Sequence, residues 1–353
     1  MPSKKHILSE VGEKKLIERI IKKTRDLQQD YYSKHPHIKK SLGDDAALMD
    51  LSELKPSNNF LVVSSDMLLA KTHFPSQMKP RERGWKIVTV NVSDISAMGA
   101  IPQGLILSIG LPGDMETKHF DELMEGVLEA CNYYQIPLIG GDTNESSQMV
   151  LSGTIIGSVE KSKVLMKSGA QPGDLVAVSG DLGLAAAGFE ILLSSTRDQQ
   201  KIKSILPEKI IKKALKQALK PEAKIKEGII AAQSGQISAA TDITDGLASE
   251  LEEIIKASNL PLGIRIYEDK IPLTDEVKKI GEFFSKKPLD MALHYGEDFE
   301  LLFCIKKDAL ASLKDKIQLM VVGEVTSTGN MEIVNKKGKI NILPPGGYQH
   351  LEG

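Results

Sequence analysis

Residues 81–112 read RERGWKIVTVNVSDISAMGAIPQGLILSIGLP, and the interpretation of the chain starts from this stretch. Its first part, residues 81–99, is rich in β-branched side chains, which favour a strand. Its length without a breaker is instead typical of a buried helix, and we expect a helix there. The glycine-bounded apolar run GLILSIG at 104–110 predicts a buried strand.

Strands and helices alternate on both sides of this stretch without a clean βαβ repeat, which predicts an α/β chain of the mixed α+β kind. The polar, turn-rich segment KSGAQPGD at 167–174 suggests a boundary near residue 165, dividing the chain into domains 1–165 and 166–353. An amphipathic first helix is expected around residues 16–21, and a solvated, lysine-rich helical face over 199–226. Further strands are expected at 60–65, 136–139, 149–159, 175–179, 239–243, 299–305 and 318–325, and helices at 115–134 and 184–193.

Composition restricts the function classes. The chain has 353 residues, of which 41% are hydrophobic and 26% charged, as in a soluble protein of two domains. A net charge of −2 gives no overall positive electrostatic potential that would attract nucleic acid. Cys131 and Cys304 are far apart, which argues against a disulfide framework or a cysteine zinc site. Because no signal-peptide core or membrane-length apolar run is seen, we expect a cytoplasmic protein with no membrane partner.

The most informative feature is a set of aspartates at predicted strand ends, flanked by small residues that let a ligand approach the backbone. Any one of them alone is explained by a turn or a helix cap, and Asp245 is well placed as a cap. As a set they predict chemistry, because clustered carboxylates are costly to bury without a positive counterpart. They lie in GDDAA (Asp44 and Asp45), SSDM (Asp66), NVSDISAMGA (Asp94), GGDT (Asp142) and TDITDG (Asp242 and Asp245).

If these carboxylates converge, the counter-charge is expected to be a hard cation, Mg²⁺ or Mn²⁺. The seven histidines form no HxH or HxxxH pair, which argues against zinc. Glycines of GGDT and the hydroxyls of Ser64 and Ser65 are suited to bind phosphate oxygens. The chain has no Walker A motif, kinase glycine loop or GxSxG elbow, so ATP chemistry requires another scaffold.

Read together, the motifs resemble those of the thiamine-monophosphate kinases. This family is related to aminoimidazole ribonucleotide synthetase, selenophosphate synthetase and the hydrogenase maturation dehydratase. The resemblance runs from about residue 10 to the C-terminus, and its motifs are specific in combination. They are GDDAA at 43–47, SSDML at 64–68, His73-Phe74, VNVSDISAMGA at 90–100, GLILSIGLP at 104–112, LIGGDT at 138–143, KSGAQPGD at 167–174, TDITDGL at 241–247, YGEDFELLF at 295–303 and GGY at 346–348.

The resemblance implies two α/β domains, with the N-terminal sheets of two subunits pairing into a shared barrel, and therefore a homodimer. It also implies Mg²⁺-dependent transfer of the γ-phosphoryl group of ATP to thiamine monophosphate, directly and in line, without a phosphoenzyme. Such a reaction is physically reasonable because the acceptor is already an anionic phosphate oxygen. It needs charge neutralisation and positioning more than a strong base, so no catalytic side chain is expected.

Individual roles follow from the same resemblance. It implies ATP contacts at Gly141, Asp142, Lys167 and Thr244, and thiamine-phosphate contacts at His73, Glu297 and Tyr348. The implied metal positions are Asp45, Ser64, Ser65, Asp66, Asp94, Asp142, Asp242 and Asp245.

Several features set this chain apart from its relatives. Lys167 stands where the family usually has arginine, and HYGED at 294–298 stands in place of GGED. Selenophosphate synthetase usually has a reactive cysteine or selenocysteine near its N-terminus and the hydrogenase protein has one at its C-terminus, whereas both cysteines here fit buried positions. Two alternatives remain open: another ATP-dependent member of the superfamily with a different substrate, and an idle nucleotide-binding protein on the same fold.

Overall fold

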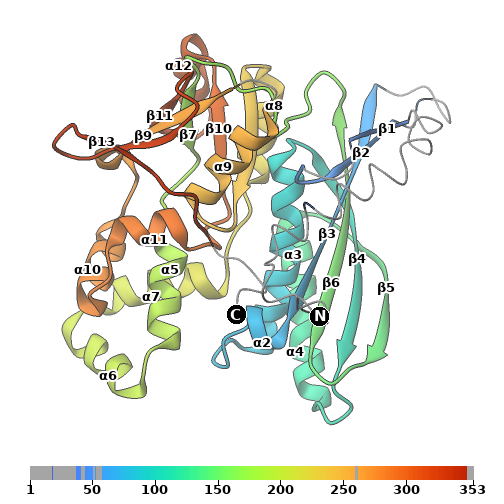
Figure 1. Ribbon diagram of the computed structural model, residues 1–353. Helices are drawn as coiled ribbons and strands as arrows, with labels where there is room; N and C mark the ends of the chain where they lie inside the picture. Colours follow the sequence, from blue (N-terminus) through green and yellow to red (C-terminus); the bar gives the residue numbers. More distant parts are fainter. Residues whose placement is uncertain are drawn as a thin grey trace, which may run out of the picture.

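The computed structural model describes residues 18, 37–40, 44–50, 52, 58–258 and 261–347, and the structural statements below concern these residues. The described chain has two sheets, one from each half of the sequence, with helices between and around them (Figure 1). The expected α/β class is thereby confirmed. The helix predicted around residues 16–21 lies outside the described part, apart from helical Glu18.

The first sheet has the strand order β1-β2-β3-β6-β4-β5, and only the β4–β5 pair is parallel. Two long helices, α3 (Pro80–Ala97) and α4 (Thr117–Tyr134), cover one face, and the short α2 (Ala70–His73) follows β3. The strands are β1 (Ile38–Lys40), β2 (Ala47–Asp50), β3 (Asn59–Leu69), β4 (Ile101–Leu111), β5 (Leu138–Glu145) and β6 (Val150–Glu160).

Helix α3 confirms the helical interpretation of the opening stretch. Pro80 occupies its first turn, and the Glu82 carboxylate accepts a hydrogen bond of 2.7 Å from the Lys79 backbone N–H, so the N-terminus is well capped. Thirteen of its 18 residues are buried, since it packs against the sheet and α4 on one side and against α8 and β8 on the other. Burial on all sides explains why the sequence lacks the usual polar face.

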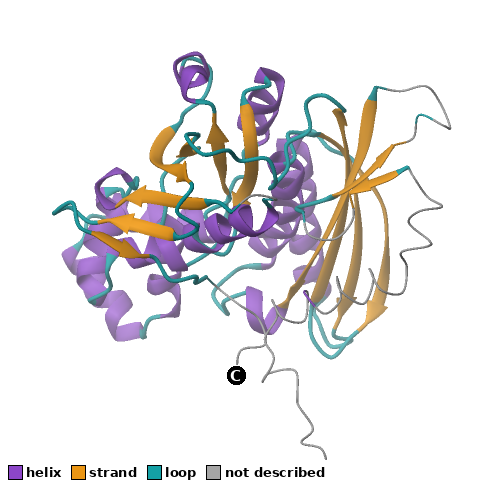
Figure 2. Ribbon diagram, turned by 45° about the horizontal axis from the view of Figure 1, so that its top comes forward, coloured by secondary structure: helices purple, strands orange, loops and turns teal. Residues whose placement is uncertain are grey.

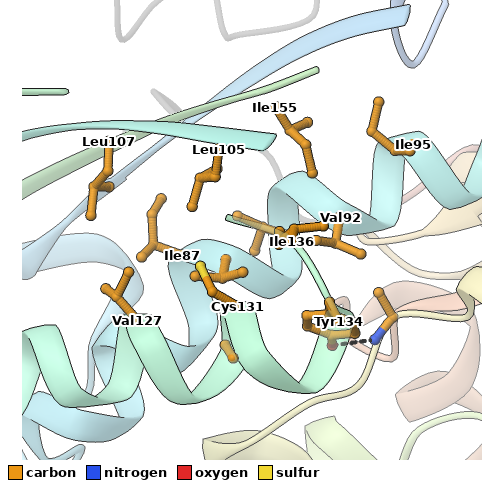
Figure 3. Close-up of a cluster of buried hydrophobic side chains, with 14 of the residues drawn as sticks. Ile87, Val92, Ile95, Leu105, Leu107, Val127, Cys131, Tyr134, Ile136 and Ile155 are labelled. Atoms are coloured by element: carbon orange, nitrogen blue, oxygen red, sulfur yellow. Dashed lines mark hydrogen bonds between the residues drawn. The ribbon is translucent and has the colours of Figure 1, made fainter. Parts of the chain in front are cut away.

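The core beneath α3 is formed by apolar side chains of the first sheet, α3 and α4. Ile87 and Val92 from α3 meet Leu105 of β4, Ile155 of β6 and Val127 of α4 (Figure 3). At about 25 cal/mol per Å² of apolar surface removed from water, each such side chain contributes roughly 1.5–3 kcal/mol. This packing fixes the height and rotation of α3 against the sheet.

The second sheet has the order β13-β12-β9-β11-β7-β10-β8, with only β9 and β12 parallel. Figure 2 shows the strands of the two sheets in orange, with helices between and around them. Its strands are β7 (Leu175–Val178), β8 (Ile237–Ile243), β9 (Gly263–Tyr267), β10 (Glu300–Ile305), β11 (Met320–Thr326), β12 (Met331–Val334) and β13 (Ile340–Ile342). The helices of this half are α5 (Leu184–Leu193), α6 (Thr196–Ile205), α7 (Glu208–Leu219), α8 (Ile225–Ser234), α9 (Leu247–Ala257), α10 (Asp275–Phe284), α11 (Pro288–His294) and α12 (Leu310–Lys314), with short 3₁₀ turns at Glu268–Lys270 and Lys307–Ala309.

Two elements differ from the sequence-based expectation. The strand expected at 136–139 is β5, which runs on through Gly140-Gly141-Asp142 instead of ending before it. The lysine-rich stretch 199–226 is not one helical face but parts of α6, α7 and α8, interrupted near Pro207 and Pro221 because proline disfavours helix continuation. Its lysines are largely exposed, as expected. None of the described helices is long and apolar enough to span a bilayer.

The two halves are joined by the segment between α7 and α8. The Pro221 carbonyl accepts a 2.6 Å hydrogen bond from the Trp85 indole N–H, and the Ala223 N–H donates to the Tyr134 hydroxyl at 2.9 Å. The Lys220 ammonium lies 4.0 Å from the centre of the Trp85 ring. Because Trp85 and Tyr134 belong to α3 and α4, these contacts hold the second half against the helical face of the first (Figures 1 and 3).

A buried aspartate connects the second sheet to the start of α5. The Asp298 carboxylate accepts hydrogen bonds from the backbone N–H groups of Gly183 (2.7 Å) and Ala185 (3.3 Å). Burial raises the pKa of Asp298 to about 7, even though these backbone donors lower it. Protonated Asp298 therefore stabilises the folded chain fully below the unfolded pKa of 3.8, and this contribution is lost as the pH rises through about 7.

We predict that Asp298→Asn flattens the dependence of stability on pH. Between pH 5 and 7 the free energy of unfolding of the parent should fall relative to the variant, by up to about 1 kcal/mol per pH unit. Urea denaturation at several pH values measures the difference. Asp308→Asn, at an exposed site in the same half, is the control and should keep the parental slope. Parallel profiles for the parent and Asp298→Asn would contradict the prediction.

Candidate active site

Four of the predicted aspartates come together where the two halves of the chain meet. Asp45 precedes β2, Asp66 lies on β3, Asp94 on α3 and Asp242 at the end of β8. Their carboxylates are close enough for mutual repulsion to raise their pKa values. Residues almost 200 positions apart therefore form one acidic cluster, which we call the aspartate cluster.

Side chains around the aspartate cluster hold its members in place. The Ser64 hydroxyl donates to the Asp94 carboxylate and also lies 3.1 Å from the Asp45 carbonyl oxygen. The Ser93 hydroxyl, on α3, donates to the Asp242 carboxylate of the other half. Thr241 Oγ1 lies 3.3 Å from Asp45 Oδ1. These neutral donors orient the carboxylates without cancelling their charge.

Burial and crowding make the aspartate cluster resist full ionisation. Burial raises the pKa of Asp45 to about 7 and that of Asp242 to about 6, against the lowering influence of Lys167. For Asp94, burial and then the charges of Asp66, Asp242 and Asp45 raise the pKa well above its usual range. The pKa of Asp66 is raised by burial too. Such a group of carboxylates favours the arrival of positive charge.

Lys167 is part of this site and not a solvated loop lysine. Its Nζ lies 2.8 Å from Asp45 Oδ1, and its side chain is 14% exposed. Burial alone lowers the pKa of Lys167, but the attraction of Asp45 and Glu250 outweighs burial and the net pKa is raised. Lys167 therefore places a compact ammonium against the aspartate cluster.

Sequence reasoning missed Glu250. This residue of α9 is buried, and its Oε1 accepts a 3.2 Å hydrogen bond from the Asp245 N–H. Burial raises the pKa of Glu250 well above its usual range, with Lys167 lowering it and Asp245 raising it. The signal lay in the sequence, because Glu250 stands one helical turn beyond Gly246, where a carboxylate can reach back to the helix N-terminus.

The residues present fit a magnesium ion of the kind that is bound together with a nucleotide. Asp45 Oδ2 is buried and has no hydrogen-bond partner among the described residues. Within those residues no three His, Cys, Asp or Glu side chains form a preformed metal cage. Mg²⁺ does not require one, since it is usually held by one or two carboxylates, waters and substrate phosphates. An incomplete set of oxygen ligands is therefore the expected arrangement.

A second group of predicted residues meets around a lysine that the sequence analysis did not single out. Lys86 Nζ lies 2.6 Å from Glu297 Oε1 and 3.0 Å from the His73 carbonyl oxygen. Glu297 is also close to Thr244, whose carbonyl accepts its N–H at 2.8 Å. The structure thus brings His73, Glu297 and Thr244 together at one place, although they come from both halves of the chain.

Gly296 makes that approach possible. A β-carbon at this position would collide with the Thr244 carbonyl, so a larger residue would push the HYGED segment away from TDITDG. The glycine is thus required for close contact of the two backbones. This glycine stands directly before Glu297 in HYGED.

Ser65 and Asp142 lie apart from the aspartate cluster. Along β3 the side chains of Ser64 and Asp66 face the helices, so Ser65 faces the other side of the sheet, where its hydroxyl meets Thr154 Oγ1 at 2.9 Å. Gly141 on β5 is in register with Asp66 through β6 and β4, about three strand spacings or 14 Å away. Asp142 follows it on an exposed edge strand.

The predicted Tyr348 lies outside the described residues. The chain before it, at Gly346 and Gly347, lies directly against His294, Asp245 and Ser249. The C-terminal stretch therefore reaches the side of the site that contains TDITDG. Both cysteines are buried, and burial raises the pKa of the Cys131 thiol to about 11, so neither has the character of a nucleophile.

Known proteins match this chain over most of its length. Residues 43–159 match the family model of the AIR synthase related protein N-terminal domain, and residues 171–336 match that of the C-terminal domain. The thiamine-monophosphate kinase of Pyrococcus horikoshii is 36% identical over 313 residues, covering 89% of this chain and 92% of that protein.

Solved structures agree as well. The structure of AaThiL complexed with AMPPCP and TMP is 30% identical with a TM-score of 0.82, covering 99% of this chain and 100% of that chain. The crystal structure of thiamine monophosphate kinase from Aquifex aeolicus is 29% identical with a TM-score of 0.71, covering 90% and 98%. Sequence and fold agree, and the chain belongs to the thiamine-monophosphate kinase family of the AIR synthase related proteins.

Proposed function

We propose that this chain transfers the γ-phosphoryl group of ATP to thiamine monophosphate, giving thiamine diphosphate and ADP, in the cytoplasm. The observation that carries the proposal is the aspartate cluster at the junction of the two halves, with the Lys86–Glu297 pair formed further along the same helix, α3. AaThiL, a relative that aligns over nearly the whole chain, has been solved complexed with AMPPCP and TMP. Two buried free thiols fit a reducing compartment.

The chemistry follows from charge. Donor and acceptor are both polyanions, and their repulsion is the main barrier to a reaction whose nucleophile is already an anionic oxygen. Bound Mg²⁺ supplies neutralisation of the phosphate oxygens. We assign the holding of these ions to Asp45, Asp66, Asp94 and Asp242, while Lys167 adds attraction for the nucleotide. Direct in-line transfer then needs positioning and no phosphorylated side chain.

The remaining assignments are part of the same proposal. Ser64 and Asp245 complete the metal set within the chain, and Ser65 and Asp142, which lie apart from the aspartate cluster, join it only in the assembled protein. Gly141, Asp142, Lys167 and Thr244 contact ATP. His73, Glu297 and Tyr348 contact thiamine monophosphate. We further propose that residues 1–165 carry nucleotide binding and dimerisation, and that residues 166–353 form the second domain.

We also propose a homodimer that forms through the first sheet. The helix-free face carries Met67, and Ile101 and Ile139 are further exposed apolar residues of this sheet, each more than half exposed. Strand β5 is an edge strand whose backbone has no partner on its outer side within the described chain. Because Asp142 lies on this edge, away from the aspartate cluster of its own chain, pairing of two copies is the route by which it joins a nucleotide site.

The reaction is tested directly with purified protein, ATP, Mg²⁺ and thiamine monophosphate. We expect thiamine diphosphate and ADP in equal amounts, and no product from free thiamine, because the acceptor must be a phosphate. Chromatography of the thiamine species measures both. Phosphorylation of thiamine with the monophosphate left unused would refute the proposed function.

The metal assignment predicts that activity requires Mg²⁺ or Mn²⁺ and disappears on chelation. Asp66→Asn should lower kcat by about 10²-fold or more, because one anchor of the ion against the transferring phosphate is lost. Asp50→Asn is a matched control: it lies on the neighbouring strand β2 and pairs with Lys161 at 2.7 Å instead of joining the aspartate cluster. If Asp66→Asn retained the parental rate, the aspartate cluster would be structural only.

The dimer is checked by light scattering at micromolar concentration, where we expect twice the chain mass of 38.5 kDa. Met67→Asp should shift the protein to monomers, since it places a charge on the proposed contact face. Leu193→Asp, at a residue 69% exposed in the other half, is the control and should remain dimeric. A monomeric parent protein would exclude the proposal.

A further inference from the structure

Lys86 is buried to an extent that is rare for a lysine. Its side chain is 1% exposed, and its ammonium lies 5.9 Å from the centre of the Phe74 ring and 5.6 Å from that of Phe189. Two of its three N–H donors meet protein acceptors, Glu297 Oε1 at 2.6 Å and the His73 carbonyl oxygen at 3.0 Å. A buried ammonium is retained only where such partners compensate the lost hydration.

Glu297 is held in a strained conformation with one oxygen left over. Its φ of 72° lies in the left-handed region, which is strained for a non-glycine residue. Lys86 engages Oε1, whereas Oε2 is buried and has no hydrogen-bond partner among the described residues. A buried carboxylate oxygen without a donor is costly, so strain and the orphan oxygen together indicate that a ligand supplies the missing hydrogen.

We propose that Lys86 is a positioning residue that fixes Glu297 so that its Oε2 accepts a hydrogen bond from an N–H group of the phosphate acceptor. This inference rests on the proposed function and adds to it the way in which the acceptor is recognised. The aminopyrimidine ring of thiamine monophosphate carries such an N–H donor, whereas its phosphate offers only acceptors. Lys86 and His73 belong to the first half and Glu297 to the second, so the carboxylate is in place only when the halves are docked.

The position of Lys86 on α3 separates its effect from that of the metal site. Asp94 is eight positions beyond Lys86, which corresponds to about 12 Å along the helix axis. Loss of Lys86 should therefore disturb binding of the acceptor while leaving the aspartate cluster and the nucleotide unaffected. A general loss of folding would instead lower the active fraction and leave both Michaelis constants unchanged.

The test compares Lys86→Met, Glu297→Gln and the double variant with the parent, in steady-state kinetics with each substrate varied and in calorimetric titration with thiamine monophosphate alone. We expect Lys86→Met to raise the KM and Kd for thiamine monophosphate about tenfold or more, the size of effect expected for a charge-assisted hydrogen bond, and the KM for ATP less than twofold. On the Glu297→Gln background the same change should add less than about threefold, because Lys86 acts through Glu297.

Lys220→Met is the matched control. Lys220 also contacts the other half of the chain: it pairs with Glu129 at 2.5 Å and lies over the Trp85 ring. Neither of these contacts involves Glu297. It should leave the KM for thiamine monophosphate unchanged. If Lys86→Met does not fold, Lys86→Gln is measured in its place with the same expected direction.

The outcomes separate this inference from the function on which it rests. A parent protein that does not convert thiamine monophosphate overturns both. A fully active parent with an unchanged KM in Lys86→Met overturns the role of Lys86 alone. Equal effects of Lys86→Met with and without Glu297→Gln overturn the claim that Lys86 acts through Glu297.

Discussion

Four carboxylates forced together at the junction of two domains form the constraint on which the rest of this structure depends. Asp45, Asp66, Asp94 and Asp242 repel one another and are removed from water, and both effects raise their pKa values. Held in this way, they are poorly compensated by the chain itself, since Lys167 is the cation paired directly with them in the described structure. Clustered negative charge of this kind is stable only in a rigid frame, and it binds hard cations in return.

Helix α3 is that frame. It is buried on all sides, so the groups that project from it cannot turn to solvent. Asp94 and Ser93 project toward the aspartate cluster, and Ser93 donates to Asp242 of the other half. Further along the helix, Lys86 connects to Glu297, and Trp85 connects to the segment between α7 and α8. One element therefore positions the proposed nucleotide site and the proposed acceptor site at a fixed separation, as in-line transfer requires.

Much of the site was predictable because its motifs are local. An aspartate in a short loop or at a strand end, with small residues on both sides, can be approached closely by a ligand. Such a motif can be recognised from the sequence alone. The patterns of Asp45, Asp66, Asp94 and Asp242 are of this type, and the structure brings these four together. Lys86 was missed because nothing in its immediate sequence distinguishes it from an ordinary helix lysine, and Glu250 because its place in the first turn of a helix indicates a helix-end carboxylate and not a site residue. Their importance arises from burial, which a local pattern does not report.

The sequence by itself determined the α/β class, the helical character of the stretch around residues 80–97 and the family, since each depends on local periodicity or on motifs. Only the tertiary structure decided which residues share a site. The pleat of β3 separates Ser65 from Ser64, and the strand order of the first sheet places Asp142 about 14 Å across the sheet from the row of Asp66. The docking of the two halves joins Lys86 to Glu297, 211 residues later in the chain. Such contacts depend on how distant segments pack. Whether a buried charge such as that of Lys86 is compensated by a partner is decided only by that packing.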